Sequence, residues 1–172
     1  MVFSTSKMAE NLDEIYDKFF KSKHEMDEKE YHDIENRKKF VRALVRSYDT
    51  RVDVDVVGYY SVFPISRKLF DELRFGRFKE SKITNDLVLD PDDGNARVLY
   101  VCEVCSVDRN SAIQLIYDLK KYISKLSREN SQIESVGAWG YTKDGRRLIE
   151  ALGMKKVKST RITKPYYEIG LR

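Results

Sequence analysis

A short polar turn separates an apolar stretch from a helical pattern near the middle of the chain. Its sequence is Asp108-Arg109-Asn110-Ser111. Asp, Asn and Ser side chains each accept hydrogen bonds from the free N–H groups that open a helix. The same helix terminus carries a partial positive charge, so a turn of this kind can hold a phosphate. The alternative is an ordinary strand–helix connection in an α/β core.

The elements that position this turn are predicted to be a strand and a long helix. Residues 97 to 107 are mostly apolar and β-branched, which is typical of a strand buried on both faces. Beyond the turn, apolar residues recur three or four positions apart, which predicts an amphipathic helix. These residues are Ala112, Leu115, Ile116, Leu119, Tyr122, Ile123 and Leu126.

Glu103 places a carboxylate inside the predicted apolar strand. Burying a carboxylate is costly unless it is paired. Burial also raises the pKa of a carboxyl group towards neutrality, where it can act as a general base. The alternatives are an ion pair with a nearby Arg or Lys, or a position on a solvated sheet surface.

The two cysteines, Cys102 and Cys105, form a Cys-x-x-Cys pattern that can indicate a redox pair or half of a zinc site. In a strand, residues three apart point to opposite faces, with Cα atoms about 10 Å apart, which is beyond disulfide reach. Only His24 and His32 could complete a metal site. We therefore expect two buried reduced thiols and no metal.

The composition is that of a soluble globular domain: 172 residues, of which 41% are hydrophobic and 35% charged. No apolar run approaches the roughly 20 residues that span a bilayer. Residues 1 to 7 lack the apolar core of a signal peptide. We therefore expect a cytoplasmic protein without a membrane partner.

Charge is distributed unevenly along the chain, although the net charge is only +4. Residues 1 to 36 hold five lysines and ten acidic residues, whereas residues 143 to 172 hold nine basic and three acidic residues. The basic end could meet an anionic partner such as RNA or a nucleotide cofactor. The alternative is an ordinary solvated face.

The first third of the chain is predicted to be helical up to about residue 50 and to enter a strand at residue 53. Apolar spacing predicts helices over 8–23 and 29–48. Residues 53–65 have strand composition, and Gly58 within them indicates a bulge or a close backbone approach. Ser66 is expected to cap a helix that ends at Gly76. Residues 78–89 are mixed, and a strong turn follows at 91–95.

The last third of the chain continues the alternation of strands and helices. Strands are expected over 133–140, 154–163 and 166–171, and a helix over 143–152 that stops at Gly153. The order predicts one α/β (α+β) domain over residues 1–172, with a mixed central sheet flanked by helices on both sides.

This order of elements resembles the GNAT superfamily of acyl-CoA-dependent N-acyltransferases over residues 53–171. In that family a strand ends in a valine, and Arg/Gln-x-x-Gly-x-Gly/Ala then opens a helix. Here Val104 precedes Arg109-Asn110-Ser111-Ala112-Ile113-Gln114, so Ala112 and Gln114 stand at the two small positions. Gly153-Met154 stands where the family has Gly-Phe.

The resemblance implies acetyl-CoA as the co-substrate. The pyrophosphate would lie on the turn and first helical residues, and the pantetheine arm would follow the end of the strand. The residues implied for the phosphates are Arg109, Asn110, Ser111, Ala112 and Gln114. Those implied for the arm are Val104, Cys105 and Val107.

The resemblance also implies an acid and a base for acyl transfer to an amine. Glu103 is the candidate base. The family's acid is a tyrosine in the last helix, and the corresponding residue here is Ile149, which cannot donate a proton. Tyr141, at the end of the preceding strand, is the nearest substitute.

Three functional hypotheses follow. The first is an N-acetyltransferase that moves an acetyl group from acetyl-CoA to an amine of unknown identity, with a homodimer as one expected assembly. The second is a catalytically inactive GNAT-fold module for ligand sensing or protein interaction, which Gln114 and Ile149 favour. The third is an RNA- or DNA-binding protein that uses the basic C-terminal third.

Overall fold

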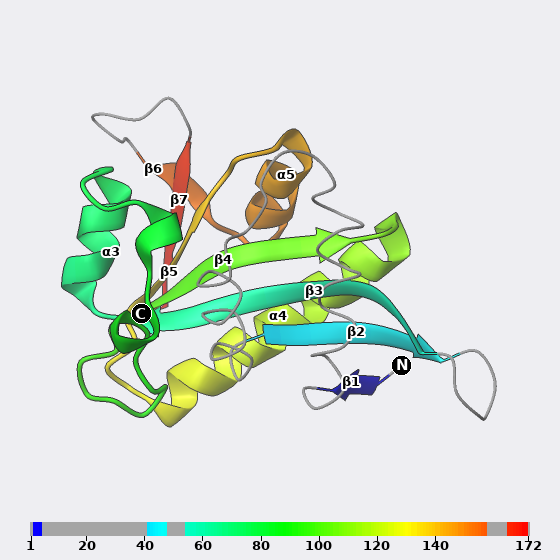
Figure 1. Cartoon of the computed structure of the whole chain (residues 1–172), viewed down its shortest axis with the longest axis horizontal. Coiled ribbons are helices and arrows are strands. Elements are labelled where there is room, and N and C mark those ends of the chain that lie inside the picture. The colour runs from blue at the N-terminus through cyan, green and yellow to red at the C-terminus, as the bar shows by residue number, and fades with distance from the viewer. Residues whose placement is uncertain (1, 5–40, 48–53, 158–164, 172) are drawn as a thin grey trace. The chain divides into compact units, whose positions relative to one another are not determined.

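The computed structural model describes residues 2–4, 41–47, 54–157 and 165–171 (Figure 1). The predicted helix over 8–23 and the segments 29–40 and 158–163 lie outside these residues. The described elements are β1 Val2–Ser4, β2 Val41–Ser47, β3 Val54–Ile65, α3 Arg67–Arg74, η2 Glu80–Lys82, η3 Asn85–Leu87, β4 Val98–Ser106, α4 Arg109–Glu129, β5 Ser135–Trp139, α5 Lys143–Ala151, β6 Lys155–Val157 and β7 Tyr166–Gly170.

The strands follow the hydrogen-bonded order β1-β2-β3-β4-β5-β7-β6. The β4–β5 ladder is parallel, whereas β1–β2, β2–β3, β5–β7 and β6–β7 are antiparallel, so the sheet is mixed. The chain divides into two compact units: Met1–Ser61 with Glu103–Leu115, and Val62–Cys102 with Ile116–Arg172. Strands β3 and β4 and helix α4 contribute residues to both units.

In the first unit, the predicted helix over 29–48 is wrong for its last part, because Val41–Ser47 form strand β2. Its apolar residues Val41, Leu44 and Val45 have helical spacing, but β2 pairs along its whole length with β3. Strand β1, which the sequence did not predict, extends this ladder from the other edge of β2. Pairing between distant segments thus overrides the local pattern.

Gly58 lies at an irregularity in the β2–β3 ladder. The register passes from Leu44↔Gly58 to Val45↔Val56, so one β3 residue, Val57, has no opposite partner. A Cβ at position 58 would lie 2.7 Å from the Cys105 carbonyl oxygen, 3.2 Å from the Ser106 Cα and 2.5 Å from Leu115 Cδ1. Both predictions for Gly58, a bulge and a close backbone approach, are therefore confirmed.

In the second unit, α3 packs on one face of the strands β5 and β7. Ser66 caps α3 by accepting a hydrogen bond from Leu69 N at 3.2 Å, and Gly76 ends it with a φ of 66°, as predicted. The buried Phe70 ring meets Tyr166 at 5.5 Å between centroids. On the same face, Glu168 accepts hydrogen bonds from Arg67 and Arg74.

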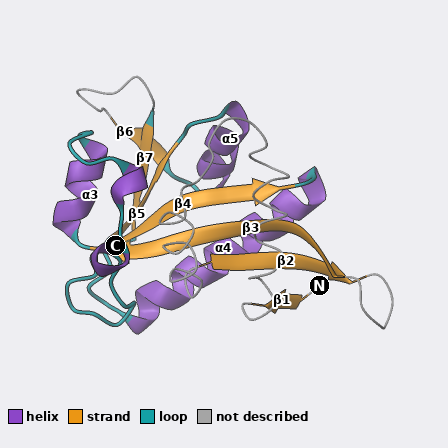
Figure 2. Cartoon of the chain, in the orientation of Figure 1, coloured by secondary structure: helices purple, strands orange, loops and turns teal. Residues whose placement is uncertain are grey.

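The opposite face of these strands meets the second half of α4 and α5. Val136 and Ile169 form a pair in the β5–β7 register and line one hollow with Ile123 of α4. The Tyr167 hydroxyl, also on this face, donates a hydrogen bond to Glu150 of α5 at 3.2 Å. Helices therefore cover both faces of a mixed sheet, which confirms the predicted α/β fold class (Figure 2).

The remaining predicted elements are largely confirmed. Residues 78–89 contain the short helices η2 and η3. Thr142 caps α5 by accepting a hydrogen bond from Gly145 N at 2.9 Å, and Gly153 ends the helix with a φ of 90°.

Strand β4 is less enclosed than predicted. Only Val98–Val101 are fully buried, whereas residues 102–106 are half-buried. No helix among the described residues is long and apolar enough to cross a membrane.

The close approach at Gly58 gives a test of the fold. We expect Gly58→Ala to lower the free energy of unfolding by roughly 1–3 kcal/mol, because the new methyl group meets the β4 backbone, which cannot rotate away. Chemical denaturation measures the change.

The matched control is Gly94→Ala, where a Cβ would have no heavy atom within 4 Å. We expect this change to stay within about 0.5 kcal/mol of wild type. Equal stability of the two variants would contradict the close approach described here.

Candidate functional site

The first turn of α4 is organised by Asp108. Its Oδ1 accepts a hydrogen bond from Ser111 N at 2.8 Å, and its carbonyl oxygen accepts from Ala112 N at 3.0 Å. Asp108 is therefore the N-cap of this 21-residue helix, as the sequence predicts for one of its polar turn residues.

Two main-chain N–H groups at this terminus have no acceptor within the described part of the chain. Arg109 and Asn110 are the first two helical residues, so neither has a helical carbonyl four positions earlier. Neither donates any other backbone hydrogen bond there. Both residues and Val107 are exposed to solvent. This terminus can therefore offer two N–H groups, the helix dipole and the Arg109 guanidinium to an anion.

The other residues predicted to bind the cofactor follow the same turn. Ser111 is fully buried, and its Oγ has no hydrogen-bond partner in the described chain. Gln114 is half-buried and lies three positions after Ser111, so the two share one face of α4. Ala112 is also half-buried, and its short side chain adds little volume beside the turn.

The end of β4 is paired with β3 on one edge. The Val107 N–H donates to the Val57 carbonyl at 3.0 Å. The parallel ladder with β5 runs from Val98↔Ser135 to Val101↔Ala138, whereas β4 itself continues to Ser106. The predicted arm residues Val104 and Cys105 lie in this continuation and are half-buried.

Glu103 lies in a small cluster with Tyr59 and Cys105. Burial raises the pKa of the Tyr59 hydroxyl far above its ordinary value, and the neighbouring Glu103 and Cys105 side chains raise it further. The Tyr59 hydroxyl oxygen is buried and forms no hydrogen bond of standard geometry. Its contacts with the Glu103 carboxylate and the Cys105 thiol are therefore longer or less well aligned than a hydrogen bond. Burial also raises the pKa of the Cys105 thiol to about 11.

Tyr141 lies in the second unit. Its hydroxyl donates a hydrogen bond to Glu80 Oε2 at 2.8 Å. Burial, followed by the negative charge of Glu80, raises the pKa of Tyr141 above its ordinary value. The hydroxyl proton of Tyr141 is thus directed to the Glu80 carboxylate. That Tyr141 acts as the acid in a reaction in which Glu103 is the base stays a prediction. Ile149 is buried in the core.

The two cysteines have different surroundings. The Cys102 thiol donates to Glu80 Oε1 at 3.0 Å, whereas Cys105 lies beside Tyr59. Both are free, as predicted, although each is half-buried rather than fully buried. Within the described ranges, no three His, Cys, Asp or Glu side chains gather in a way that could hold a metal ion.

Glu80 is the residue of this region that the sequence did not single out. It opens the three-residue helix η2, in a segment with no strong periodicity. Its importance comes from its two hydrogen bonds, to Cys102 and Tyr141, which lie 22 and 61 residues away. No local pattern could have indicated these partners.

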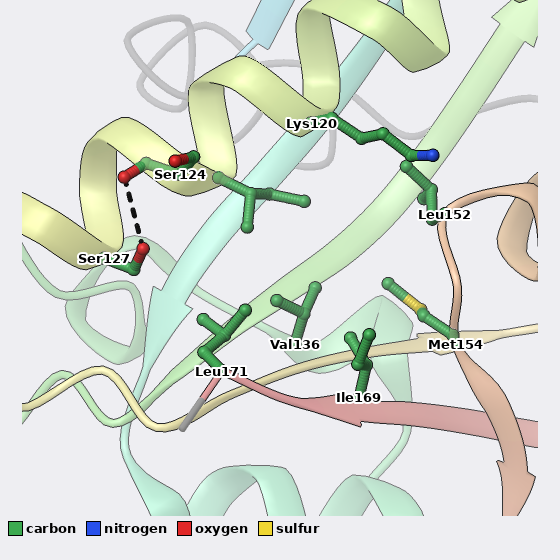
Figure 3. Close-up of a pocket in the computed structure, with 9 residues that line it drawn as sticks. Lys120, Ser124, Ser127, Val136, Leu152, Met154, Ile169 and Leu171 are labelled. Atoms are coloured by element: carbon green, nitrogen blue, oxygen red, sulfur yellow. Dashed lines mark hydrogen bonds between the residues drawn. The ribbon is translucent and has the colours of Figure 1, made fainter.

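A separate hollow of about 310 Å³ lies in the second unit (Figure 3). Its walls are mainly apolar, and Lys120 is the charged residue among those that line it. Its lining is Lys120, Ile123, Ser124, Ser127, Val136, Leu152, Met154, Ile169 and Leu171. It contains none of the predicted site residues.

Comparison with known proteins finds relatives in structure only. No family model matches this chain, and no curated protein matches it. Among solved structures, Arabidopsis thaliana NAA60 in complex with acetyl-CoA is similar with a TM-score of 0.62 and 16% identity, covering 99% of this chain and 98% of that one.

Two further solved structures are also similar to this chain. The structure of the mosquito protein named arylalkylamine N-acetyltransferase like 5b has a TM-score of 0.62 at 11% identity, and the match covers 99% of both chains. A GNAT-family acetyltransferase of Listeria monocytogenes has a TM-score of 0.53 at 13% identity and covers 99% of this chain and 94% of that one. The chain therefore has the GNAT fold, which confirms the fold expected from the resemblance seen in the sequence.

The environment of Cys105 predicts low thiol reactivity. Because the raised pKa leaves little thiolate at pH 8, we expect iodoacetamide to alkylate Cys105 about 100-fold more slowly than an ordinary thiol. The rate should rise about tenfold for each pH unit between 8 and 10. Mass spectrometry of a Cys102→Ser variant isolates the reaction at Cys105.

The same variant unfolded in urea is the internal control, because unfolding returns the thiol to its ordinary pKa. Equal rates of alkylation in the folded and unfolded protein at pH 8 would show that Cys105 is not held as a buried thiol.

Proposed function

We propose that this protein is an N-acetyltransferase that moves an acetyl group from acetyl-CoA to an amine. The observation that carries the proposal is the N-terminus of α4, where Arg109 and Asn110 present N–H groups that have no acceptor among the described residues. A diphosphate needs such donors and a nearby cation, and the Arg109 side chain supplies the cation. The residues present therefore fit the phosphates of acetyl-CoA.

The extension of β4 supports the same proposal. The strand runs five residues beyond the last pair of its ladder with β5. Its edge towards β3 is engaged by the Val107–Val57 hydrogen bond. An extended pantetheine arm can pair with main-chain groups of a strand as a further strand would. Val104 and Cys105 are the residues proposed to line it. The NAA60 structure of similar fold is a complex with acetyl-CoA.

Asp108 is the feature that opposes anion binding at this terminus. Its carboxylate occupies the cap position and takes the Ser111 N–H. A like charge beside a diphosphate lowers affinity. We therefore propose that the affinity for acetyl-CoA is set by the balance between Arg109 and Asp108.

For the reaction, acetyl-CoA supplies an activated acetyl group, and CoA leaves as the free thiol. The chain must hold the amine, remove a proton from it and provide a proton to the leaving sulfur. Glu103 is the proposed base, since its carboxylate lies in the β4 extension beside Tyr59 and Cys105. Tyr141 is the proposed acid.

A catalytically inactive ligand-binding module is the second candidate. It is favoured by Ile149, a buried residue without a proton to donate, at the position where the resemblance implies a tyrosine. The two candidates differ in turnover: both bind acetyl-CoA, but only the enzyme releases free CoA in the presence of an amine.

Acetyl-CoA binding tests the phosphate site. We expect acetyl-CoA to raise the Tm of the wild type by mass action. Arg109→Glu should lower the affinity about tenfold or more, because it removes a charge-assisted donor and adds a like charge. Calorimetric titration with acetyl-CoA gives the dissociation constants.

Asp108→Asn should have the opposite effect to Arg109→Glu, because asparagine keeps the capping oxygen but removes the negative charge. We expect affinity for acetyl-CoA to rise roughly two- to fivefold. Lys68→Glu, an exposed charge reversal in the first turn of α3, is the control and should leave affinity unchanged. If Arg109→Glu and Lys68→Glu behave alike, the phosphates do not bind at α4.

A further inference from the structure

The hollow beside the second half of α4 is bounded by several elements of one compact unit. Its strand side is the registered pair Val136 and Ile169 of β5 and β7. Leu152 and Met154, from the link between α5 and β6, lie next to this pair, and α4 runs along the side opposite the strands (Figure 3). Val136 and Met154 are buried, whereas Ile169 and Leu152 are only half-buried. Apolar side chains next to the core therefore reach the surface of the hollow.

The polar side chains that line the hollow all come from α4. Lys120, Ser124 and Ser127 lie at positions i, i+4 and i+7 of the helix, so they share one face. The buried Ile123 is the apolar residue that α4 contributes to the same lining. The five lining residues from other elements are apolar. An occupant of the hollow therefore meets apolar groups from the strands and the α5–β6 link, and polar groups along α4 alone.

Lys120 differs from the next lysines of α4. The Lys121 Nζ lies 4.4 Å from the centroid of a tyrosine ring, and Lys125 forms an ion pair with Glu129 at 3.7 Å. Lys120 forms neither an ion pair nor a hydrogen bond with any residue that the structure describes. Figure 3 shows its side chain reaching from α4 towards Leu152. No described carboxylate therefore competes with a bound anion for the Lys120 ammonium group.

Two hydroxyl groups follow Lys120 on the same face of α4. The Ser127 hydroxyl donates to the Ser124 carbonyl oxygen at 3.2 Å, so its proton is already used. The Ser124 hydroxyl has no hydrogen-bond partner in the described ranges, and it lies one helical turn after Lys120. A hydroxyl donates one hydrogen bond, and an ammonium group donates three. Lys120 and Ser124 can therefore donate to the two oxygens of one carboxylate.

Volume and charge narrow the class of occupant. The hollow has a volume of about 310 Å³, which is near the lower end of the roughly 300–1,000 Å³ typical of small-molecule sites. At about 30 Å³ for each water-sized group, it has room for about ten non-hydrogen atoms. A single ammonium group balances one negative charge. That count matches a carboxylate better than a phosphate monoester, whose charge is about −1.5 to −2 at neutral pH.

We propose that this hollow is a binding site for a medium-chain aliphatic carboxylate. The carboxylate binds Lys120 and Ser124, and the hydrocarbon chain lies against Val136, Ile169 and Met154. Burial of the chain against these side chains supplies the favourable free energy, and the charged head fixes its orientation. The site shares no residue with the proposed acetyl-CoA site, so it is a second ligand site that goes beyond the proposed function.

Titration with octanoate, in the absence of acetyl-CoA, tests this site. Octanoate is an aliphatic carboxylate of matching size, and 1-octanol is its neutral match. We expect octanoate to shift the methyl NMR signals of Met154 and Ile169 saturably, and 1-octanol to bind about fivefold more weakly. Lys120→Gln should weaken octanoate binding about fivefold and leave 1-octanol binding within about twofold, because it removes only the charge.

Lys125→Gln is the matched control, because Lys125 also lies on α4 but does not line the hollow. This variant should bind octanoate as the wild type does. Ser127→Leu places an apolar side chain in the hollow, so it should abolish the binding of both compounds. The Tm of each variant reports whether it is folded.

The inference is wrong if octanoate causes no saturable shift at Met154 and Ile169, or if folded Lys120→Gln binds octanoate as tightly as the wild type does. Equal affinities of octanoate and 1-octanol for the wild type would also contradict it. A second copy of the chain is the competing occupant: a dimer that Ser127→Leu dissociates and octanoate does not would assign the hollow to that copy. The proposed function is tested separately, because acetyl-CoA binding at Arg109 is measured without octanoate.

Discussion

The missing side chain of Gly58 is the constraint on which the candidate cofactor site depends. The β3 backbone at this position lies so close to the Cys105 carbonyl and to Leu115 that no Cβ fits. The adjacent Val57 carbonyl accepts the Val107 N–H at 3.0 Å. These two contacts fix the end of β4 and the first turns of α4 against one strand. The position of the turn between them follows from that attachment.

The turn itself combines attraction and repulsion for an anion. Helix geometry leaves the Arg109 and Asn110 N–H groups without acceptors in the part of the chain that the structure describes, and the dipole adds positive potential. The cap residue Asp108 brings a negative charge to the same place. A capping asparagine would serve the helix equally well. Capping alone therefore does not require the negative charge of Asp108.

Two clusters of similar chemistry occur in the two units. Each contains a glutamate, a half-buried cysteine and a buried tyrosine: Glu103 with Cys105 and Tyr59, and Glu80 with Cys102 and Tyr100. In both, burial raises the pKa of the phenol above its ordinary value. The Cys-x-x-Cys pattern thus marks two separate environments. Each thiol is a weak polar neighbour of a carboxylate.

Elements whose signals are local could be predicted from the sequence. Ser66, Asp108 and Gly76 act within one turn of the chain, so caps and stops could be predicted, as could β3, β4, α4 and the order that resembles GNAT proteins. The strand Val41–Ser47 could be recognised only in the folded chain, because the hydrogen bonds of β2 come from β3 and not from its own neighbours. The same holds for the contacts of Glu80, whose partners are distant in sequence. Local propensity depends on adjacent residues, whereas strand pairing and polar contacts between distant residues form only when the chain folds.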